Sequence, residues 1–178
     1  MLKGMLSVSV LIVNMLPSND EHALFVIEKF QSKGDRCTVI NVYEETVHSC
    51  KGCYLCWFHT PGICFQKDIC ENILREYLKN DTIIYITKTS LGTIHFKTKN
   101  VIDRVSFCSI TPFDEYRNDE TFHTCRYQKK YQIGIIYTGN ADKDLMNSWV
   151  ERWALNITST SIGAYPIENV EELLKCIP

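Results

Sequence analysis

The chain has 178 residues, 45% of them hydrophobic and 22% charged, which is an ordinary composition for a single globular domain with a sizeable core. Its formal net charge of −2 and its pI near 6.2 exclude a general attraction to nucleic acid or to an anionic membrane surface. Its nine cysteines, an odd number in a chain of this length, exclude a small secreted scaffold stapled by disulfides, so we expect a reducing, cytoplasmic setting.

The first apolar run predicts a buried strand. Residues 5–16 have the outline of a signal peptide, but no small-residue cleavage site follows them, and the run is far shorter than the ~20 residues of a membrane span. We therefore expect no membrane partner. Within this run, residues 7–14 form a nearly continuous β-branched and aliphatic stretch, which is typical of a strand covered on both faces.

A helix is predicted over residues 20–33, after a loop at 15–19. Ser18 or Asn19 can cap its N-terminus, because a short polar side chain accepts hydrogen bonds from the first free amides. Its apolar face is expected to consist of Leu24, Ile27 and Phe30.

A second strand over residues 37–42 leads into a cysteine-rich loop at 50–67. Two residues between cysteines let a tight turn direct both sulfurs at one centre, and this spacing recurs in zinc and iron–sulfur sites. The sequence therefore predicts a four-thiolate metal site, and it leaves open whether the thiols hold a [4Fe–4S] cluster, zinc, or no metal, as reduced thiols against the core. The four cysteines of this loop are Cys50, Cys53, Cys56 and Cys64.

Strands and helices continue to alternate beyond this loop. A helix opens at Asp68, with Glu71 placed for a capping box, and a third buried strand follows at 82–87. A loop at 89–95 contains Gly92 and precedes a helix over 96–105. The apolar stripe of the helix that begins at Asp68 comprises Ile69, Ile73, Leu74, Tyr77 and Leu78.

The last third of the chain begins with a polar, aromatic and irregular insertion at 106–130, which contains the breakers Pro112 and Asp114. A fourth strand is expected at 131–138 and a helix at 142–157. That helix carries Leu145, Trp149 and Trp153 on one face, which we expect to contact the core or a second copy of the chain. A fifth strand at 160–165 and a helix at 168–177 complete the chain.

Five short apolar strands that alternate with helices predict one α/β domain over residues 1–178, with a parallel sheet between two helical layers. In such sheets the ligand lies outside the carboxyl ends of the strands, at the switch point of the strand order. The loops at 15–19, 87–92 and 138–142 should meet there. The cysteine-rich loop leaves the same edge, so we expect a thiolate centre beside a cofactor crevice.

Two stretches of the chain resemble the flavodoxin-like NAD(P)H-dependent FMN reductase family, including the iron–sulfur flavoproteins. The first is the cysteine-rich loop after the second strand, whose spacing is similar to that of a [4Fe–4S] site in those flavoproteins. The second is a strand, a loop with Gly92, and a helix that ends in the K-x-x-I-D-R pattern of Lys99–Arg104. The resemblance implies a five-stranded sheet of order 2-1-3-4-5 within a three-layer fold.

The resemblance also implies an FMN-dependent NAD(P)H oxidoreductase that passes electrons to a small acceptor or a redox protein, and a homodimer or higher homo-oligomer. The first loop departs from the family pattern, since it has no arginine or glycine and Asp20 and Glu21 carry the same sign as a phosphate. The residues that the resemblance places against FMN are Ser18, Asn19, Thr87, Lys88, Thr89, Ser90, Leu91, Gly92, Thr138, Gly139 and Asn140.

Two other functions are compatible with the sequence. The fold could have lost flavin binding and kept a structural zinc or redox-thiol site. Alternatively the chain is a non-catalytic assembly module that uses the insertion at 106–130 as a partner surface. The aromatic and charged residues of that surface would be Phe113, Tyr116, Arg117, Phe122, His123 and Tyr127.

Overall fold

A parallel sheet forms the centre of the molecule in this computed structural model, which describes residues 8–117 and 120–177, excluding the side chains of 106–107 and 111–117. Its parallel strands lie in the order β2-β1-β3-β7-β8, which is 2-1-3-4-5 when they are counted along the chain. This is the order of the flavodoxin-like fold, so the predicted fold is confirmed. The strands are β1 (Ser9–Asn14), β2 (Arg36–Asn41), β3 (Thr82–Ser90), β7 (Gln132–Thr138) and β8 (Thr160–Pro166).

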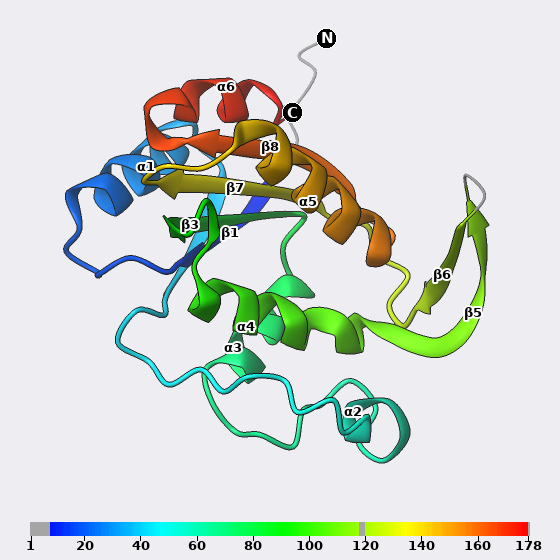
Figure 1. Ribbon diagram of the computed structural model, residues 1–178. Helices are drawn as coiled ribbons and strands as arrows, with labels where there is room; N and C mark the ends of the chain where they lie inside the picture. Colours follow the sequence, from blue (N-terminus) through cyan, green and yellow to red (C-terminus); the bar gives the residue numbers. More distant parts are fainter. Residues whose placement is uncertain (1–7, 118–119, 178) are drawn as a thin grey trace, which may run out of the picture.

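Helices cover both faces of this sheet (Figure 1). Because both faces are covered, every residue of β1 is buried, as its continuous apolar pattern predicts. No helix in the described ranges combines the length and the apolar character that a membrane span requires. One face carries α1 (Glu21–Ser32) and α6 (Val170–Lys175), and the other carries α3 (Cys70–Tyr77), α4 (Phe96–Arg104) and α5 (Lys143–Asn156).

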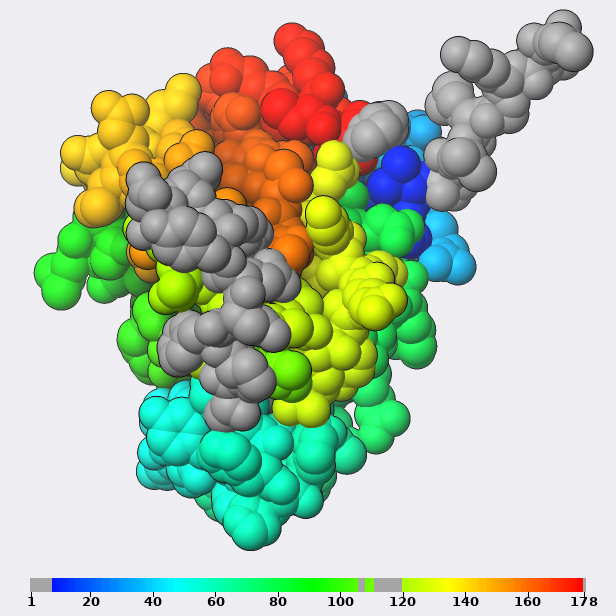
Figure 2. All heavy atoms as spheres, turned by 90° about the vertical axis from the view of Figure 1, so that its right-hand side faces the viewer, coloured from blue at the N-terminus to red at the C-terminus, as the bar shows by residue number. Residues whose placement is uncertain are grey.

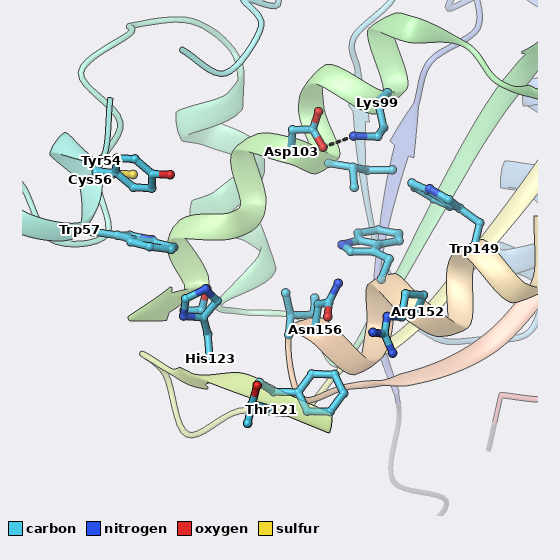
Figure 3. A pocket seen from close by; sticks show the side chains of 15 residues that line it. Tyr54, Cys56, Trp57, Lys99, Asp103, Thr121, His123, Trp149, Arg152 and Asn156 are labelled. Carbon is cyan, nitrogen blue, oxygen red and sulfur yellow. Dashed lines mark hydrogen bonds and ion pairs between the residues drawn. The ribbon is translucent and has the colours of Figure 1, made fainter. Parts of the chain in front are cut away.

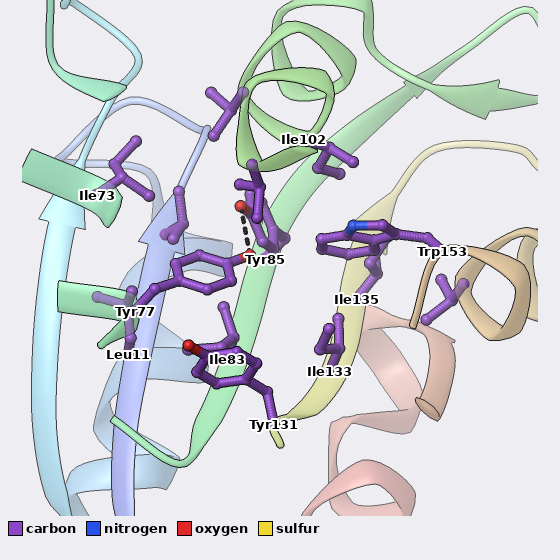
Figure 4. Packing of buried hydrophobic residues seen from close by; sticks show 14 of the residues in the cluster. Leu11, Ile73, Tyr77, Ile83, Tyr85, Ile102, Tyr131, Ile133, Ile135 and Trp153 are labelled. Atoms are coloured by element: carbon purple, nitrogen blue, oxygen red, sulfur yellow. Dashed lines mark hydrogen bonds between the residues drawn. The ribbon is translucent and has the colours of Figure 1, made fainter. Parts of the chain in front are cut away.

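Aromatic side chains join the second of these faces to its helices (Figure 4). The hydroxyls of Tyr77 and Tyr85 lie 2.8 Å apart in a buried hydrogen bond, so neither polar group is left unsatisfied in the core. The ring of Tyr85 meets Trp153 edge-on at 5.5 Å, and Tyr77 meets Tyr131 in the same way at 5.6 Å. Trp153 is therefore part of the core, which is one of the two positions predicted for it, the other being a contact with a second copy of the chain.

The apolar faces of two helices differ from those predicted. On α1 the buried residues are Ala23, Val26 and Phe30, whereas Leu24 is 50% exposed. On α5 Leu145 is 55% exposed. On each helix a neighbouring residue lies closer to the sheet than the predicted leucine does. The direction of the helix across the sheet determines which part of a broad apolar stripe is covered.

The capping box expected at α3 is also absent. Asp68 Oδ1 accepts a hydrogen bond from the Cys70 amide, but Glu71 forms ion pairs with Lys67 and Arg75 instead of reaching back to the backbone. Lys67 and Arg75, four residues before and after Glu71, attract its carboxylate more strongly than the single amide does.

The insertion at 106–130 is not irregular. It forms a short 3-10 helix, η1 (Val105–Cys108), and an antiparallel hairpin of β5 (Ser109–Arg117) and β6 (Glu120–Cys125). The two breakers, Pro112 and Asp114, fall at the two shifts of the hairpin register, between Ser109 and Phe113 and between Phe113 and Glu115. A β-bulge accommodates such residues without ending the pairing, which is why the prediction of a loop was wrong.

The cysteine-rich segment, which is the predicted cysteine-rich loop at 50–67, lies at the end of the molecule farthest from α6 (Figures 1 and 2). Its only helix among the described residues is α2 (Leu55–Phe58), a single turn within the predicted loop. The closing helix of the chain begins as a 3-10 turn, η2 (Ile167–Asn169), and continues as α6.

Candidate functional site

A crevice of about 540 Å³ lies at the carboxyl edge of the sheet, between the turn after β3 and the loop after β7. Both segments follow neighbouring parallel strands, so their ends meet at this edge. Six of the eight lining residues are among those that the sequence places against a cofactor. The lining consists of Thr89, Ser90, Leu91, Gly92, Gly139, Asn140, Ala141 and Asp142.

The turn after β3 is tighter than the predicted loop. β3 continues to Ser90, and β4 (Thr93–Ile94) pairs back against it. Leu91 and Gly92 between them have φ angles of 52° and 79°, as in a type I′ turn. Leucine rarely adopts this left-handed conformation, which costs roughly 1–2 kcal/mol for a residue with a Cβ atom. The Leu91 side chain is fully exposed at the rim of the crevice.

Thr89 connects the two walls of the crevice. Its hydroxyl donates toward the carbonyls of Thr138, at 3.2 Å, and Asn140, at 3.0 Å. A Cβ atom on Gly139 would lie 2.6 Å from Thr89 Oγ1, and Gly139 has a φ of 93°. Only glycine therefore allows this approach of the two loops. A parallel bridge between Gly92 and Ala141 holds them together further along.

Several of the predicted cofactor residues do not line this crevice. Thr87 is buried, and its hydroxyl lies 2.6 Å from that of Thr98. Lys88 is exposed, and its carbonyl accepts a hydrogen bond from the His95 amide. Thr138 contributes only the carbonyl that Thr89 contacts, and Ser18 and Asn19 are exposed on the loop before α1.

The N-terminus of α1 does not fit a phosphate group. Asp20, rather than Ser18 or Asn19, caps this helix, and its Oδ1 accepts hydrogen bonds from the amides of His22 and Ala23 at 2.9 and 3.1 Å. These are the amides that bind a phosphate at a helix N-terminus. A carboxylate already occupies them, and Glu21 adds a second negative charge in the first turn.

The first loop also packs inward at the switch point between β1 and β3. Met15 and Leu16 are 5% and 4% exposed, and the Met15 amide donates to the carbonyl of Ile86 at 2.8 Å. The buried Asn14 carboxamide donates to Asn41 Oδ1 and accepts from the Leu16 amide. The open space at this edge therefore lies between β3 and β7, one strand away from the switch point.

Two further lining residues, Ala141 and Asp142, belong to the loop at 138–142 that was expected at this edge but were not among the residues predicted to contact a cofactor. Asp142 Oδ1 accepts hydrogen bonds from the amides of Asp144 and Leu145, so it caps α5 at the floor of the crevice. An aspartate directly before an apolar helix is an N-cap signal, and this signal was sufficient to find it.

The four thiols of the cysteine-rich segment do not lie beside the crevice, as none of its eight lining residues is a cysteine. In the described ranges no three His, Cys, Asp or Glu side chains are grouped so that they could hold a metal ion. Burial raises the pKa of the Cys56 thiol, and the charges of Cys64, Cys50 and Cys53 raise it further. A four-thiolate metal site stays a prediction.

A buried ion pair fixes the cysteine-rich segment to α4. The side chains of Arg104 and Asp68 are each 1% exposed and in direct contact. Arg104 also donates to the carbonyls of Gln66, at 3.0 Å, and His48, at 3.4 Å, while the His48 amide donates to Asp68. Arg104 is the last residue of the K-x-x-I-D-R pattern, and here it holds both ends of the segment together.

Of the residues predicted to form a partner surface on the insertion at 106–130, one is buried and two are partly exposed among those whose side chains are described. Phe122 is 4% exposed, and His123 meets the ring of Trp57 edge-on at 4.9 Å. Tyr127 is half-buried beside Gly62. The side chains of Phe113, Tyr116 and Arg117 lie outside the described residues.

No protein-family model and no curated protein matches the sequence, but solved structures match the fold. NAD(P)H:quinone oxidoreductase from Methanothermobacter marburgensis superposes with a TM-score of 0.62 and 15% identity, over 96% of this chain and 95% of that one. An azoreductase from Bacillus anthracis str. Sterne superposes with a TM-score of 0.58 and 11% identity, over 94% and 93%.

RosB, solved with 8-demethyl-8-formylriboflavin-5′-phosphate bound, superposes with a TM-score of 0.60 and 12% identity. The alignment covers 89% of this chain but only 64% of RosB, so this chain spans less than two thirds of that protein. At these identities the likeness shows the fold alone.

Proposed function

We propose that this chain is an NAD(P)H-dependent flavin oxidoreductase of the cytoplasm, and that the flavin ring binds in the crevice between the β3–β4 turn and the β7–α5 loop. The observation that carries the proposal is the convergence of six predicted cofactor residues on one cavity at the carboxyl edge of the sheet. The fold, which is shared with the NAD(P)H:quinone oxidoreductase and the azoreductase named above, supports it.

The crevice residues fit a flat ring. Gly92 has no side chain, and no atom lies within 4 Å of the position that its Cβ would take, so a ring can approach the backbone closely there. The exposed side chain of Leu91 offers an apolar contact, and Asn140 offers a carboxamide to the polar edge of a ligand. A bound flavin would supply the redox chemistry, because it accepts a hydride from a nicotinamide and releases electrons to an acceptor.

The chain does not hold the 5′-phosphate of FMN at α1, because Asp20 occupies the amides there. Binding energy in this site therefore comes from the ring, and we expect FMN and riboflavin to bind with similar affinity. Titration of the purified protein with each flavin, followed by flavin fluorescence, measures both dissociation constants. Oxidation of NADH and of NADPH, with each flavin and an added quinone or dye acceptor, then measures turnover.

One pair of variants separates the crevice from the rest of the fold. Gly139→Ala places a methyl group 2.6 Å from Thr89 Oγ1, so we expect flavin affinity to fall by about tenfold or more. Gly34→Ala imposes the same kind of backbone strain, at a φ of 86°, but has no atom within 4 Å and lies after α1. Equal flavin affinity in both variants, or no flavin binding by the natural protein, would refute the proposal.

The remaining expectations concern partners and metal. A homodimer is tested by sedimentation over a range of protein concentrations. A cluster or zinc ion on Cys50, Cys53, Cys56 and Cys64 is tested by counting iron, zinc and acid-labile sulfide in protein purified without oxygen. Iron and sulfide in equal amounts would support the cluster, zinc alone a structural site, and neither would leave four reduced thiols.

A further inference from the structure

A second cavity, of about 480 Å³, lies away from the crevice between α4, α5, the β5–β6 hairpin and the cysteine-rich segment (Figure 3). All three tryptophans of the chain line it: Trp57, Trp149 and Trp153. Asp142 lines the crevice at the start of α5, whereas Asn156 lines this cavity at its end. Trp149, the cavity residue nearest to Asp142 along α5, is about 10 Å away along the helix, and the two cavities share no lining residue, so they are separate sites.

Aromatic rings form two facing walls of this cavity. Figure 3 shows Trp57 and His123 on one side and Trp149 on the other. Trp57 and His123 meet edge-on with their centroids 4.9 Å apart, and Trp149 lies 5.8 Å from Trp153, whose other contacts are in the core. Rings held in this way lose little freedom when a flat molecule enters between them, and aromatic rings prefer offset or edge contacts with such a molecule.

The charged groups around the cavity are already neutralised. Lys99 forms an ion pair with Asp103, four residues further along α4, and Arg152 forms one with Glu120 of the hairpin. The Arg152 guanidinium also lies 5.6 Å from the centre of the Phe122 ring. Among the described residues of the lining, each of these side chains therefore already has an oppositely charged partner, so a charged ligand finds no free counter-charge there, whereas an uncharged ligand needs none.

Polar groups without a charge remain available at the rim. The side chains of Asn156 and Tyr54 line the cavity, and Tyr54 is 56% exposed. Tyr54 also adopts a φ of 57°, an unfavourable conformation for a tyrosine, and its ring lies 5.3 Å from that of Trp57. Backbone strain of this kind tends to occur where a side chain is held for a ligand.

We propose that this cavity binds a planar, uncharged aromatic molecule with a hydrogen-bonding carbonyl group, held between the rings of Trp57 and Trp149. Its volume falls within the range of small-molecule sites, and an apolar lining with a few converging polar groups is their usual composition. The paired charges select against ionic ligands, and Asn156 and Tyr54 bind the carbonyl group.

The test uses 2-naphthamide as the probe and ¹⁵N NMR of the full chain as the measurement. The indole N–H signals of the three tryptophans should shift together with one dissociation constant. The anion 2-naphthoate, which has the same ring system, should bind about tenfold more weakly. Cyclohexanecarboxamide, which has no aromatic ring, should shift none of the three signals.

Variants of α5 identify the site. Trp149→Ala should weaken 2-naphthamide binding by about fivefold, whereas Trp149→Phe, which keeps a ring and guards against a folding defect, should stay within about twofold. Leu145→Ala removes an exposed apolar side chain from the same helix outside the cavity and should leave the affinity unchanged. Gly139→Ala, in the crevice, should also leave it unchanged, which separates this site from the proposed flavin site.

Four results would overturn the inference. Indole signals that do not move at about 1 mM 2-naphthamide would exclude a useful site. Shifts confined to residues 89–92 and 139–142 would place the probe in the crevice instead. Equal affinity for the amide and the anion would remove the argument from charge, and unchanged binding in Trp149→Ala would remove the argument from stacking.

Discussion

Leu91 combines an unfavourable backbone conformation with complete exposure at the rim of the crevice. Nothing in the fold requires leucine at this turn, because asparagine before glycine is the preferred pair in a type I′ turn. On the proposed function, the exposed Leu91 side chain contacts the flavin ring.

Leu91→Asn should raise the free energy of unfolding by about 1 kcal/mol and weaken flavin binding, since it relieves the strain and removes the apolar contact. Urea denaturation and flavin titration measure the two effects on one sample. Leu145→Asn is the matched control, because Leu145 is exposed within a helix and should not be stabilised. A Leu91→Asn variant that gains stability and keeps its flavin affinity would mean that the ring does not contact this residue.

Arg104→Met should destabilise the protein by about 3–5 kcal/mol, because it leaves the Asp68 carboxylate buried without a partner. Lys67→Ala breaks an exposed ion pair with Glu71 and should cause no measurable change. Asp68→Leu combined with Arg104→Met should recover part of the loss, since an apolar pair can replace a buried ionic one. Equal stability of Arg104→Met and the natural protein in urea would contradict the anchoring role.

The same ion pair predicts a dependence of stability on pH. Burial alone raises the pKa of the Asp68 carboxyl, but the hydrogen bonds from the His48 amide and Arg104 outweigh this effect and lower the pKa. The stabilisation is therefore complete above the unfolded-state pKa of about 3.9 and is lost as pH falls through the lower folded-state value. Arg104→Met should lose this part of the acid dependence. Urea denaturation at pH values from about 2 to about 6, a range that brackets the ordinary aspartate pKa, would measure the loss.

Thiol reactivity distinguishes the cysteines. Burial raises the pKa of Cys70 and Cys108 to about 12, so both should stay unmodified by iodoacetamide near neutral pH. Cys50, Cys53 and Cys176 are exposed and should react rapidly. A metal would protect Cys50, Cys53, Cys56 and Cys64 as a group but leave Cys176 reactive. Mass spectrometry before and after chelation measures this pattern, and unchanged modification of the four thiols would exclude a removable metal.

At the scale of elements, the proposed flavin site makes a prediction about the cap of α1. Asp20→Ser keeps a capping oxygen and removes the negative charge, so it should strengthen FMN binding relative to riboflavin by about fivefold. Asp20→Ala removes the cap as well and should cost about 1 kcal/mol of stability. The ratio of the two dissociation constants is the measurement. An unchanged ratio in Asp20→Ser would mean that a bound FMN directs its phosphate away from α1.

The path of α4 explains why the thiols and the crevice lie apart. The helix begins beside β4 at the carboxyl edge of the sheet and ends at Arg104, about 13 Å away. Because Arg104 contacts Gln66, Asp68 and His48, the cysteine-rich segment is held at the far end of α4. The strand that precedes this segment, β2, does end at the carboxyl edge, which is why the sequence predicted the thiols beside the crevice. That prediction was wrong because the contacts of Arg104 hold the segment elsewhere.

For the molecule as a whole, α5 separates two chemically different cavities. The crevice at its N-terminal end is polar and glycine-rich, and the cavity at its C-terminal end contains every tryptophan of the chain. Neither cavity belongs to one element, since each is closed by segments far apart in the sequence. Ligands of the two sites can therefore be tested independently with variants of a single helix.

By itself the sequence determined the five parallel strands and most of the helices, because apolar periodicity, caps and turn residues act over a few neighbouring positions. Its resemblance to a known family implied the strand order and six residues of the crevice. Only the tertiary structure decided that Arg104 anchors the cysteine-rich segment and that β5 and β6 form a bulged hairpin. It also placed Trp57 around the same cavity as Trp149 and Trp153. Such contacts depend on how distant segments pack, and no local pattern in the chain encodes that packing.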